Sequence, residues 1–437
     1  MAALLFWTPL VSAVVIDVAS GEQGVTETAT GSDGLTKTGS GTLVIWSAQN
    51  YTGQTAIDAG QIMFGGGGAI SESSPLQIAS GASINLTGYY AANDINRTFA
   101  GLTGGGILYG GGGSVTIRKD SGTDTFSGAV QGGHAFIKDG AGTLVLSGSS
   151  SHSGGTLISA GTLDLNGGSV QGGITNHASL VIRNDLANAV SGTGSLIKEG
   201  TGVATLWNPT TYTGATVVNS GQIKLGGSGA ISESSSLQIA EGASINLTGP
   251  WAAADINRTF AGLTGAGILY GGGGSVTINK ASGTDTFSGG IQGAQTLIKT
   301  GAGTLSLSGN NNSYSGGTLI SGGTLKILSG GAVANNITNN ATLNFDGAHG
   351  GIANVISGTG SLVKSGEGMA VLYTASTYTG ATVVSGGQLM LGGAGSISSS
   401  SGLDVAAGAS VNLTGYYAAD NINRTINGLT GAGTVYG

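Results

Sequence analysis

The motif Lys-x-Gly-x-Gly-x-x-x-Leu/Ile occurs five times in this chain. The copies begin at Lys37, Lys138, Lys198, Lys299 and Lys364. A second motif, Tyr/His-Thr/Ser-Gly-x-Thr, follows each copy. A chain that repeats in this way folds as a stack of units, because each unit can bury its apolar side chains only against its neighbours. We therefore expect a repeat fold whose function is spread over a long surface.

The five copies alternate between two forms and define a larger module. Lys37 lies 161 residues before Lys198, and Lys198 lies 166 residues before Lys364. Segments between the lysines, such as INLTG and INRT, also recur with this period. The predicted modules cover approximately residues 31–191, 192–357 and 358–437, the third being truncated.

Composition and strand length predict an all-β fold. Glycine contributes 87 of 437 residues, and β-branched and other apolar residues stand between the glycines, which is typical of many short strands joined by tight turns. Two-residue alternation predicts inward-facing Leu144, Leu146, Leu157, Leu163 and Leu165. These strands are too short to bury an apolar face alone. We predict a right-handed parallel β-helix of roughly 18–21 turns at about 20–25 residues per turn.

Charge and cysteine content exclude several classes of protein. The net charge is −7 and only 8% of residues are charged, which gives no basic surface for nucleic acid. The chain has no cysteine, so disulfide scaffolds and thiolate zinc sites are excluded. The chain has no run of about 18 apolar residues, so the sequence predicts no transmembrane helix. Residues 1–13 resemble the apolar part of a secretory signal, and residues 1–20 are either the remnant of such a signal or a first strand.

The segments Lys138–Leu165 and Lys299–Ile327 resemble the passenger-associated transport repeat of autotransporter passenger domains in Gram-negative bacteria. The match is looser at the other three lysines, and the repeats with their intervening strands cover most of residues 31–437. The resemblance implies a β-helical passenger exported to the cell surface by its own C-terminal β-barrel. We find no barrel strands before Gly437, so we expect this chain to be a passenger segment without the barrel. The barrel would be its only attachment to the outer membrane.

Two repeated positions have both a structural and a functional interpretation. The five lysines could form a ligand-binding row, but we favour side chains whose stems cover a turn and whose charged heads reach outward into solvent. Asn85, Asn246 and Asn412 of the INLTG strands are expected to be structural, as stacked amides.

The loop after INLTG is the candidate ligand-binding site. It carries an aromatic residue in every module, with an arginine close by; the candidate contacts are Tyr89, Tyr90, Arg97, Trp251, Arg258, Tyr416, Tyr417 and Arg424. Aromatic rings stack on the C–H faces of sugars and polar groups orient their hydroxyls, so a glycan is the predicted ligand. The alternative is a structural loop whose ring covers an adjoining turn and whose arginine binds a backbone carbonyl.

We predict that the chain is not an enzyme and has no catalytic, cofactor or metal site. Its four histidines are irregularly spaced, and no serine lies in a nucleophile motif. Asp124 and Asp285 of the GTDTFSG segment are repeated carboxylates, one in each of the first two modules.

These patterns predict a surface-exposed or secreted passenger that acts as an adhesin or autoaggregation stalk. Its partners would be a host-surface glycan or protein, or another cell carrying the same chain. The alternatives are a passive export scaffold or spacer and, as the weakest, a β-helical carbohydrate-active enzyme. Nucleic acid is not an expected partner.

Overall fold

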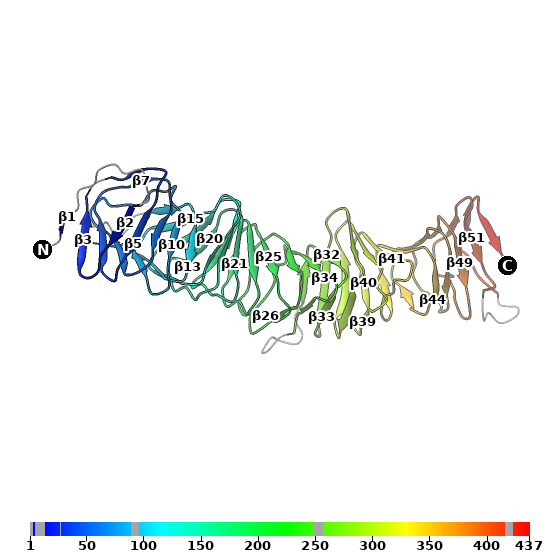
Figure 1. Ribbon diagram of the computed structural model, residues 1–437. Coiled ribbons are helices and arrows are strands. Elements are labelled where there is room, and N and C mark those ends of the chain that lie inside the picture. The colour runs from blue at the N-terminus through cyan, green and yellow to red at the C-terminus, as the bar shows by residue number, and fades with distance from the viewer. Residues whose placement is uncertain (1–2, 5–13, 27, 89–95, 249–256, 416–422) are drawn as a thin grey trace. The chain divides into compact units, whose positions relative to one another are not determined.

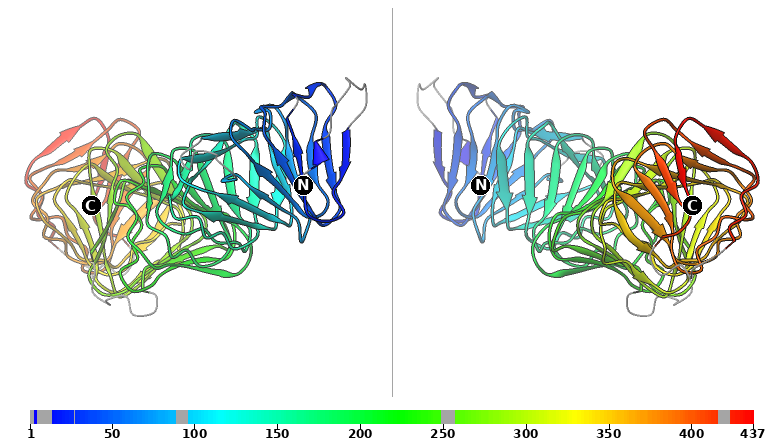
Figure 2. Two further views of the ribbon diagram at one scale, coloured as in Figure 1. Left: turned by 90° about the vertical axis from the view of Figure 1, so that its left-hand side faces the viewer. Right: turned by 90° about the vertical axis from the view of Figure 1, so that its right-hand side faces the viewer.

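The computed structural model describes residues 3–4, 14–26, 28–88, 96–248, 257–415 and 423–437. They form two compact units, residues 1–214 and residues 215–437, which are described separately. Every regular element among them is a β-strand. The strands stack in parallel as a β-solenoid of about 20 turns, which confirms the predicted parallel β-helix (Figures 1 and 2).

The first unit contains three stacks of parallel strands. The longest sheet consists of β2 (Val14–Asp17), β5 (Leu35–Thr38), β8 (Thr55–Ile57), β10 (Leu76–Ile78), β13 (Leu102–Gly104), β16 (Thr123–Phe126), β19 (Thr143–Leu146), β21 (Thr162–Leu165), β23 (Ser179–Ile182) and β25 (Ser195–Lys198). The second sheet consists of β1 (Ala3–Leu4), β3 (Glu22–Val25), β6 (Thr42–Ile45), β9 (Gln61–Phe64), β11 (Ser83–Asn85), β14 (Ile107–Gly110) and β17 (Ala129–Gly132). The third sheet consists of β12 (Arg97–Phe99), β15 (Ser114–Arg118), β18 (Ala135–Asp139), β20 (Thr156–Ile158), β22 (Ile174–Asn176) and β24 (Val190–Ser191). The remaining strands are the pair β4 (Thr30–Gly31) and β7 (Asn50–Tyr51), and β26 (Val203–Leu206).

The second unit repeats this arrangement. Its longest sheet consists of β27 (Thr216–Val218), β29 (Ser236–Ile239), β32 (Gly262–Gly265), β35 (Thr284–Phe287), β38 (Thr304–Leu307), β41 (Thr324–Leu328), β43 (Thr342–Asp346), β46 (Ser361–Ser365), β48 (Thr382–Val384), β50 (Leu403–Val405) and β52 (Leu429–Gly431). A second sheet consists of β28 (Gln222–Leu225), β30 (Ser244–Asn246), β33 (Ile268–Gly271), β36 (Gly290–Gly293) and β39 (Ser313–Tyr314). A third consists of β31 (Arg258–Phe260), β34 (Ser275–Asn279), β37 (Thr296–Thr300), β40 (Thr318–Ile320), β42 (Ile337–Asn339) and β45 (Ile356–Ser357). The fourth consists of β44 (His349–Ile352), β47 (Met369–Leu372), β49 (Gln388–Leu391), β51 (Ser410–Asn412) and β53 (Thr434–Tyr436).

Inward-facing apolar side chains form a continuous core inside each unit. In the first unit, one column of buried leucines in paired positions consists of Leu144, Leu163, Leu180 and Leu196. The matching column of the second unit consists of Leu305, Leu325, Leu343 and Leu362. Each buried leucine contributes about 1.5–3 kcal/mol, and only a stack of turns can bury all of them.

One predicted core position is wrong. Leu157 was expected to face inward, but its side chain lies on the outer face of β20 and is only partly buried. Thr156 and Ile158 take the inward positions on this strand. The reason is that Thr156 bonds to a buried side chain inside the solenoid, which fixes the opposite phase of the two-residue alternation.

The two forms of the lysine motif lie in different sheets. In the first unit, Lys37 and Lys198 belong to the longest sheet, whereas Lys138 belongs to the third sheet. In the second unit, Lys364 again belongs to the longest sheet and Lys299 to the third. The alternation seen in the sequence therefore reflects the sheet in which each copy of the motif begins.

Candidate binding surface

The predicted glycan loop is only partly covered by the described residues. Its aromatic members all lie outside them: Tyr89, Tyr90, Trp251, Tyr416 and Tyr417. Their contact with a glycan therefore stays a prediction.

The three loop arginines are half-buried and bind backbone. In Arg97, Nη2 donates to the carbonyl oxygen of Gly68 at 2.9 Å, and the guanidinium lies 5.0 Å from the centre of the Phe64 ring. The equivalent bonds run from Arg258 to Gly229 and from Arg424 to Gly395. Burial lowers the pKa of all three guanidinium groups below the usual value. The arginines thus make the backbone contacts expected of the structural alternative.

The five repeated lysines are buried inside the solenoid, which corrects the expectation that their heads reach solvent. Lys299 has no exposed surface, and its Nζ donates to the carbonyl oxygens of Thr300 at 2.6 Å, Gly301 at 2.9 Å and Gly322 at 3.1 Å. Burial lowers its pKa to about 8, so the group is still mainly protonated at neutral pH. An ammonium has three donors, and here all three meet carbonyl oxygens.

This geometry explains the spacing of the motif. The other four lysines also donate to the carbonyl oxygens of the next two residues; they are Lys37, Lys138, Lys198 and Lys364. The second of these residues is always glycine, and Gly301 has a φ of 73°. A positive φ turns its carbonyl inward at no steric cost only in glycine. The motif therefore builds a turn around a buried charge, and its lysines are unavailable to a ligand.

The second motif closes the same turn from inside. Tyr314 is fully buried, and its hydroxyl lies 2.6 Å from Oγ1 of Thr318. The corresponding distance is 2.7 Å between Tyr51 and Thr55. Burial is the main cause that raises the pKa of Tyr314 to about 12. The repeated four-residue spacing of this motif is thus the one that allows a hydrogen bond in the core.

The asparagines of INLTG are structural, although they do not form the expected amide stack. Across the sheet, Asn85 is paired with Met63 and Tyr109. Its Oδ1 instead accepts from the backbone N–H of Thr87 at 2.9 Å and from the Thr87 hydroxyl at 2.7 Å. Asn246 and Asn412 make the same local turn.

The repeated carboxylates of GTDTFSG, Asp124 and Asp285, are held by their neighbours. Asp124 is buried, with Oδ1 at 2.5 Å from Lys119 Nζ and Oδ2 accepting from the Leu102 N–H at 2.9 Å. Asp285 repeats this arrangement with Lys280 and Leu263. A carboxylate fixed by an ammonium and an amide is a structural pair that joins successive turns.

Two histidines form a buried pair in the first unit. His134 and His152 are fully buried, and their rings stack with centroids 5.8 Å apart. Nε2 of His152 lies 2.9 Å from Oγ1 of Thr156, so His152 takes the place of the tyrosine in the second motif. Burial lowers the pKa of both imidazoles, that of His152 to about 4, with the charge of His134 as a further cause.

Because of this buried pair, we expect the free energy of unfolding to fall in acid. A histidine in the unfolded chain has a pKa near 6.5, whereas His152 in the folded chain titrates at about 4. The unfolded chain therefore binds more protons between these values, and stability falls as the pH drops from about 6.5 to about 4. Above about pH 7 both states are neutral and the pair has no effect.

The measurement is the urea midpoint at about pH 7.5 and about pH 4.5. Wild type is compared with a His134→Gln/His152→Tyr variant, which introduces the residues found at Gln295 and Tyr314 of the second unit. We expect the variant to lose less stability on acidification. An equal loss in both proteins would show that the pair does not contribute.

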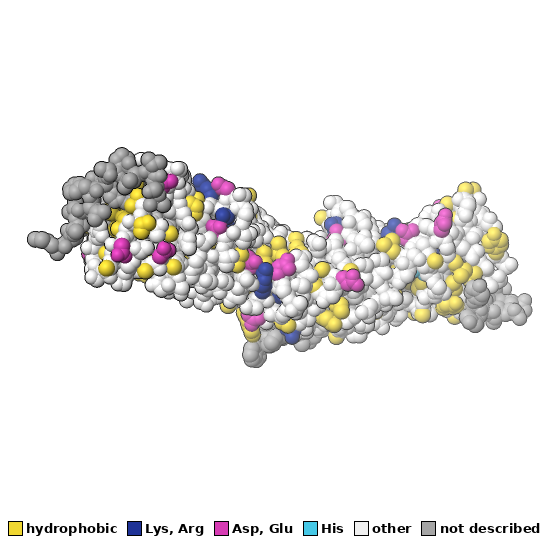
Figure 3. All heavy atoms as spheres, viewed as in Figure 1, with side chains coloured by type: hydrophobic (Ala, Val, Ile, Leu, Met, Phe, Trp, Pro, Cys, Tyr) yellow, Lys and Arg dark blue, Asp and Glu magenta, His cyan; other side chains and the backbone are white. Residues whose placement is uncertain are grey.

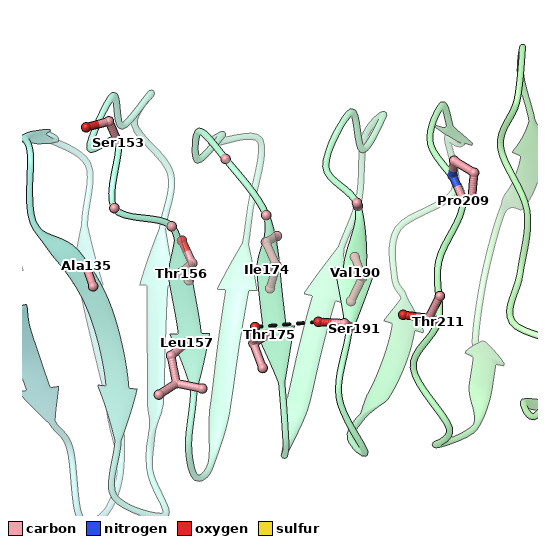
Figure 4. A pocket seen from close by; sticks show the side chains of 15 residues that line it. Ala135, Ser153, Thr156, Leu157, Ile174, Thr175, Val190, Ser191, Pro209 and Thr211 are labelled. Atoms are coloured by element: carbon pink, nitrogen blue, oxygen red, sulfur yellow. Dashed lines mark hydrogen bonds between the residues drawn. The ribbon is translucent and has the colours of Figure 1, made fainter.

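A groove of about 520 Å³ crosses the outer face of the third sheet in the first unit. Figure 4 shows Leu157, Thr175, Ser191 and Thr211 along it, on successive turns. The Ser191 hydroxyl lies 3.5 Å from that of Thr175. Its lining is entirely small, uncharged and aliphatic or hydroxylic side chains, so it offers hydrogen bonds but no acid, base or aromatic platform.

A more distinctive surface lies on the second sheet of each unit, where a tyrosine recurs on the outer face. We use the name tyrosine row for this tyrosine together with the outward residues that are paired with it and with each other on adjacent strands. The row of the first unit consists of Met63, Asn85, Tyr109 and Gln131. The row of the second unit consists of Lys224, Asn246, Tyr270 and Gln292. Tyr109 is 43% exposed. Tyr436 is paired with Asn412 in the same way on the fourth sheet of the second unit. The residue pattern that marks this surface is ILYG or TVYG.

The surface around these features carries few charges. Figure 3 shows small groups of basic and acidic side chains, separated by wide areas of other side chains and backbone with hydrophobic side chains among them. No helix long and apolar enough to cross a membrane is found in the described part of the chain.

Comparison with known proteins agrees with the repeat structure. The family described as Passenger-associated-transport-repeat matches residues 35–62, 136–165, 196–225, 297–327 and 362–391. The chain is also similar to the Adhesin BmaC autotransporter of Brucella suis biovar 1 (strain 1330), with 31% identity over 346 residues. This match covers 67% of the chain, which spans only 10% of the length of that relative. No solved structure matches the chain.

Each family match begins two residues before one of the five buried lysines, so the matched segments are the turns built by the lysine and tyrosine or histidine motifs. The chain therefore belongs to the autotransporter passenger domains that are built from passenger-associated transport repeats.

Proposed function

We propose that this chain acts as an adhesin, exposed on the surface of a Gram-negative cell after export across the outer membrane. The observation that carries the proposal is the recurrence of one outward surface, the tyrosine row, on sheets of both units. Identical weak contacts that act together gain affinity by multivalency. The similarity to a protein named as an autotransporter adhesin supports this role.

The groups of the repeat that could have been catalytic have structural roles, which supports a binding function. The five lysines hold backbone carbonyls, the arginines bind the preceding turn, and the carboxylates of Asp124 and Asp285 are each paired with a lysine. The described surface exposes the aromatic side chains of Tyr109 and Tyr436, and the tyrosine row carries amide side chains beside them. Such groups recognise neutral partners by hydrogen bonding and stacking.

The test is display of the chain on a non-aggregating bacterial host, fused to a heterologous outer-membrane anchor. We expect faster settling of the cells or stronger attachment to host-cell monolayers than with the anchor alone. A matched displayed variant, Tyr109→Ala/Tyr270→Ala/Tyr436→Ala, should lose most of the gain, since all three side chains lie on outer faces. If wild type behaves like the anchor alone, the chain is a passive spacer or export scaffold and the adhesin role is wrong.

A further inference from the structure

The tyrosine row of the second unit borders a groove that the sequence did not reveal. The groove has a volume of about 360 Å³ and crosses β28, β30, β33 and β36, of which β33 is labelled in Figure 1. Gln222, Ser244 and Tyr270 line it from the sheet, and Asn310 and Asn311 line it from the loop before β39. We propose that this groove binds a linear, uncharged oligosaccharide; this deepens the adhesin function proposed above and rests on it.

The charge and chemistry of the lining favour a neutral sugar. None of the residues that line the groove is charged. Tyr270 is half-buried on the outer face of β33 and lines the groove. A ring in this position can stack on the C–H face of a sugar. The amide of Gln222, which donates to the Ser244 hydroxyl at 2.9 Å, and the two asparagine amides supply donors and acceptors for sugar hydroxyls.

The same geometry disfavours an extended peptide. A peptide usually binds a sheet by adding a strand to an edge and using its free backbone groups. Here β30 is paired with β28 on one side and with β33 on the other, so its backbone hydrogen bonds are already made. Recognition must therefore come from side chains. Four successive strands at about 4.8 Å spacing span about 14 Å, which suits several sugar rings better than one.

The first unit provides an internal comparison. Its equivalent surface has Ala129 where the second unit has Gly290, and Ser149 where the second unit has the Asn310–Asn311 pair. Each loop then makes the same bond to a strand that precedes it in the chain. Ser150 Oγ accepts from the Val130 N–H of β17, and Asn312 Oδ1 accepts from the Ile291 N–H of β36. A Cβ added at Gly290 would lie 2.7 Å from the carbonyl oxygen of Asn311. The glycine and the longer asparagine loop thus shape the groove of the second unit.

The test uses the full chain, with cellohexaose and chitohexaose as neutral probes and a heparin hexasaccharide as the anionic control, in calorimetric titrations. We expect one dominant site for a neutral probe. Tyr270→Ala should weaken binding about tenfold, as expected for the loss of one stacked ring. The control Val15→Ala, at an exposed outer-face position of β2 in the first unit and outside the tyrosine row, should leave binding unchanged. Asn310→Ser/Asn311→Ser should weaken it several-fold, while circular dichroism and the thermal midpoint stay at wild-type values.

The proposal is overturned if neither neutral probe binds, if the heparin fragment binds more tightly, or if Val15→Ala and Tyr270→Ala have equal effects. It is also overturned if Tyr270 is needed only for association between copies of the chain. Cells that display wild type and Tyr270→Ala separate this proposal from the adhesin function. Adhesion without oligosaccharide binding would support the adhesin function and exclude the groove as an oligosaccharide site. Oligosaccharide binding through Tyr270 without adhesion would support the groove as an oligosaccharide site and exclude the adhesin function.

Discussion

Replacing Lys299 with methionine is expected to destabilise the turns around β37 and β40 by about 3 kcal/mol. The variant keeps the volume of the aliphatic stem but removes the donor shared by the carbonyl oxygens of Thr300, Gly301 and Gly322. These carbonyls belong to the backbone and stay in place. The carbonyl of Thr300 keeps the Lys280 N–H as a donor at 3.1 Å, whereas those of Gly301 and Gly322 lose the ammonium, at a cost of about 1–3 kcal/mol each. The removed cost of burying the ammonium offsets part of this loss, but it does not satisfy the carbonyls.

The effect is measured by amide hydrogen exchange, because a repeat protein opens locally rather than in one cooperative step. Exchange in peptides that cover residues 296–328 should speed up about 100-fold, which corresponds to about 3 kcal/mol. Peptides from the equivalent turns of the first unit serve as the internal reference. Lys224→Met is the matched control, since its side chain lies on an outer face and the other modules have Met63 and Met390 there. Unchanged exchange in the Lys299 variant, or an equal effect of Lys224→Met, would contradict the buried-charge role.

The arrangement of strands could be predicted from the sequence because it depends on local patterns. Two-residue alternation and glycine spacing determine where strands begin and end, and repetition requires that neighbouring turns bury each other's apolar faces. Leu305 and Leu325 illustrate this, since they occupy equivalent places in consecutive turns and are paired in the structure. The phase of one strand was wrong at Leu157, because the inward bond of Thr156 decides it.

The direction of the lysines could have been predicted from the same alternation. Leu297 and Lys299 lie two residues apart on β37 and both face inward. The expectation of an outward head relied on the tendency of a lysine to cover apolar surface with its stem while its charged head stays in solvent. The cost of burying the charge is offset by carbonyls that a turn with a positive-φ glycine directs inward, and neither the turn nor the acceptor from the next turn is visible in a linear pattern.

The binding surface could be predicted least, because it depends on which residues become neighbours in successive turns. INLTG occurs once in a module, so the turns on either side of Asn85 present other residues, and the expected amide stack does not form. For the same reason the row of Asn246, Tyr270 and Gln292 is assembled from three segments that carry no joint sequence signal. Its one visible sign is the recurrence of a tyrosine at an outward position of the ILYG strand.

Replacing Gly293 with alanine is expected to cost at least about 3 kcal/mol, at the upper end of what strained backbone positions cost. Gly293 ends β36 with a φ of 120°, a conformation that residues with a Cβ rarely adopt. A Cβ there would also lie 2.0 Å from the carbonyl oxygen of Gly271 on the adjacent strand β33. Because that oxygen is fixed in the sheet, the clash can be relieved only by separating the two strands. Strain and clash therefore act in the same direction.

The matched control is Gly283→Ala, which separates the two causes. Gly283 has a φ of 69°, and an added Cβ would meet no atom within 4 Å, so only the conformational cost of about 1–2 kcal/mol applies. Hydrogen exchange should speed up in β33, β36 and β39 of the Gly293 variant and much less around Gly283 in the control. Since β33 and β36 also border the groove of the second unit, the Gly293 variant should lose oligosaccharide binding together with strand protection. Equal exchange in the two variants would mean that conformational strain alone, and not close packing between turns, explains the glycine at this position.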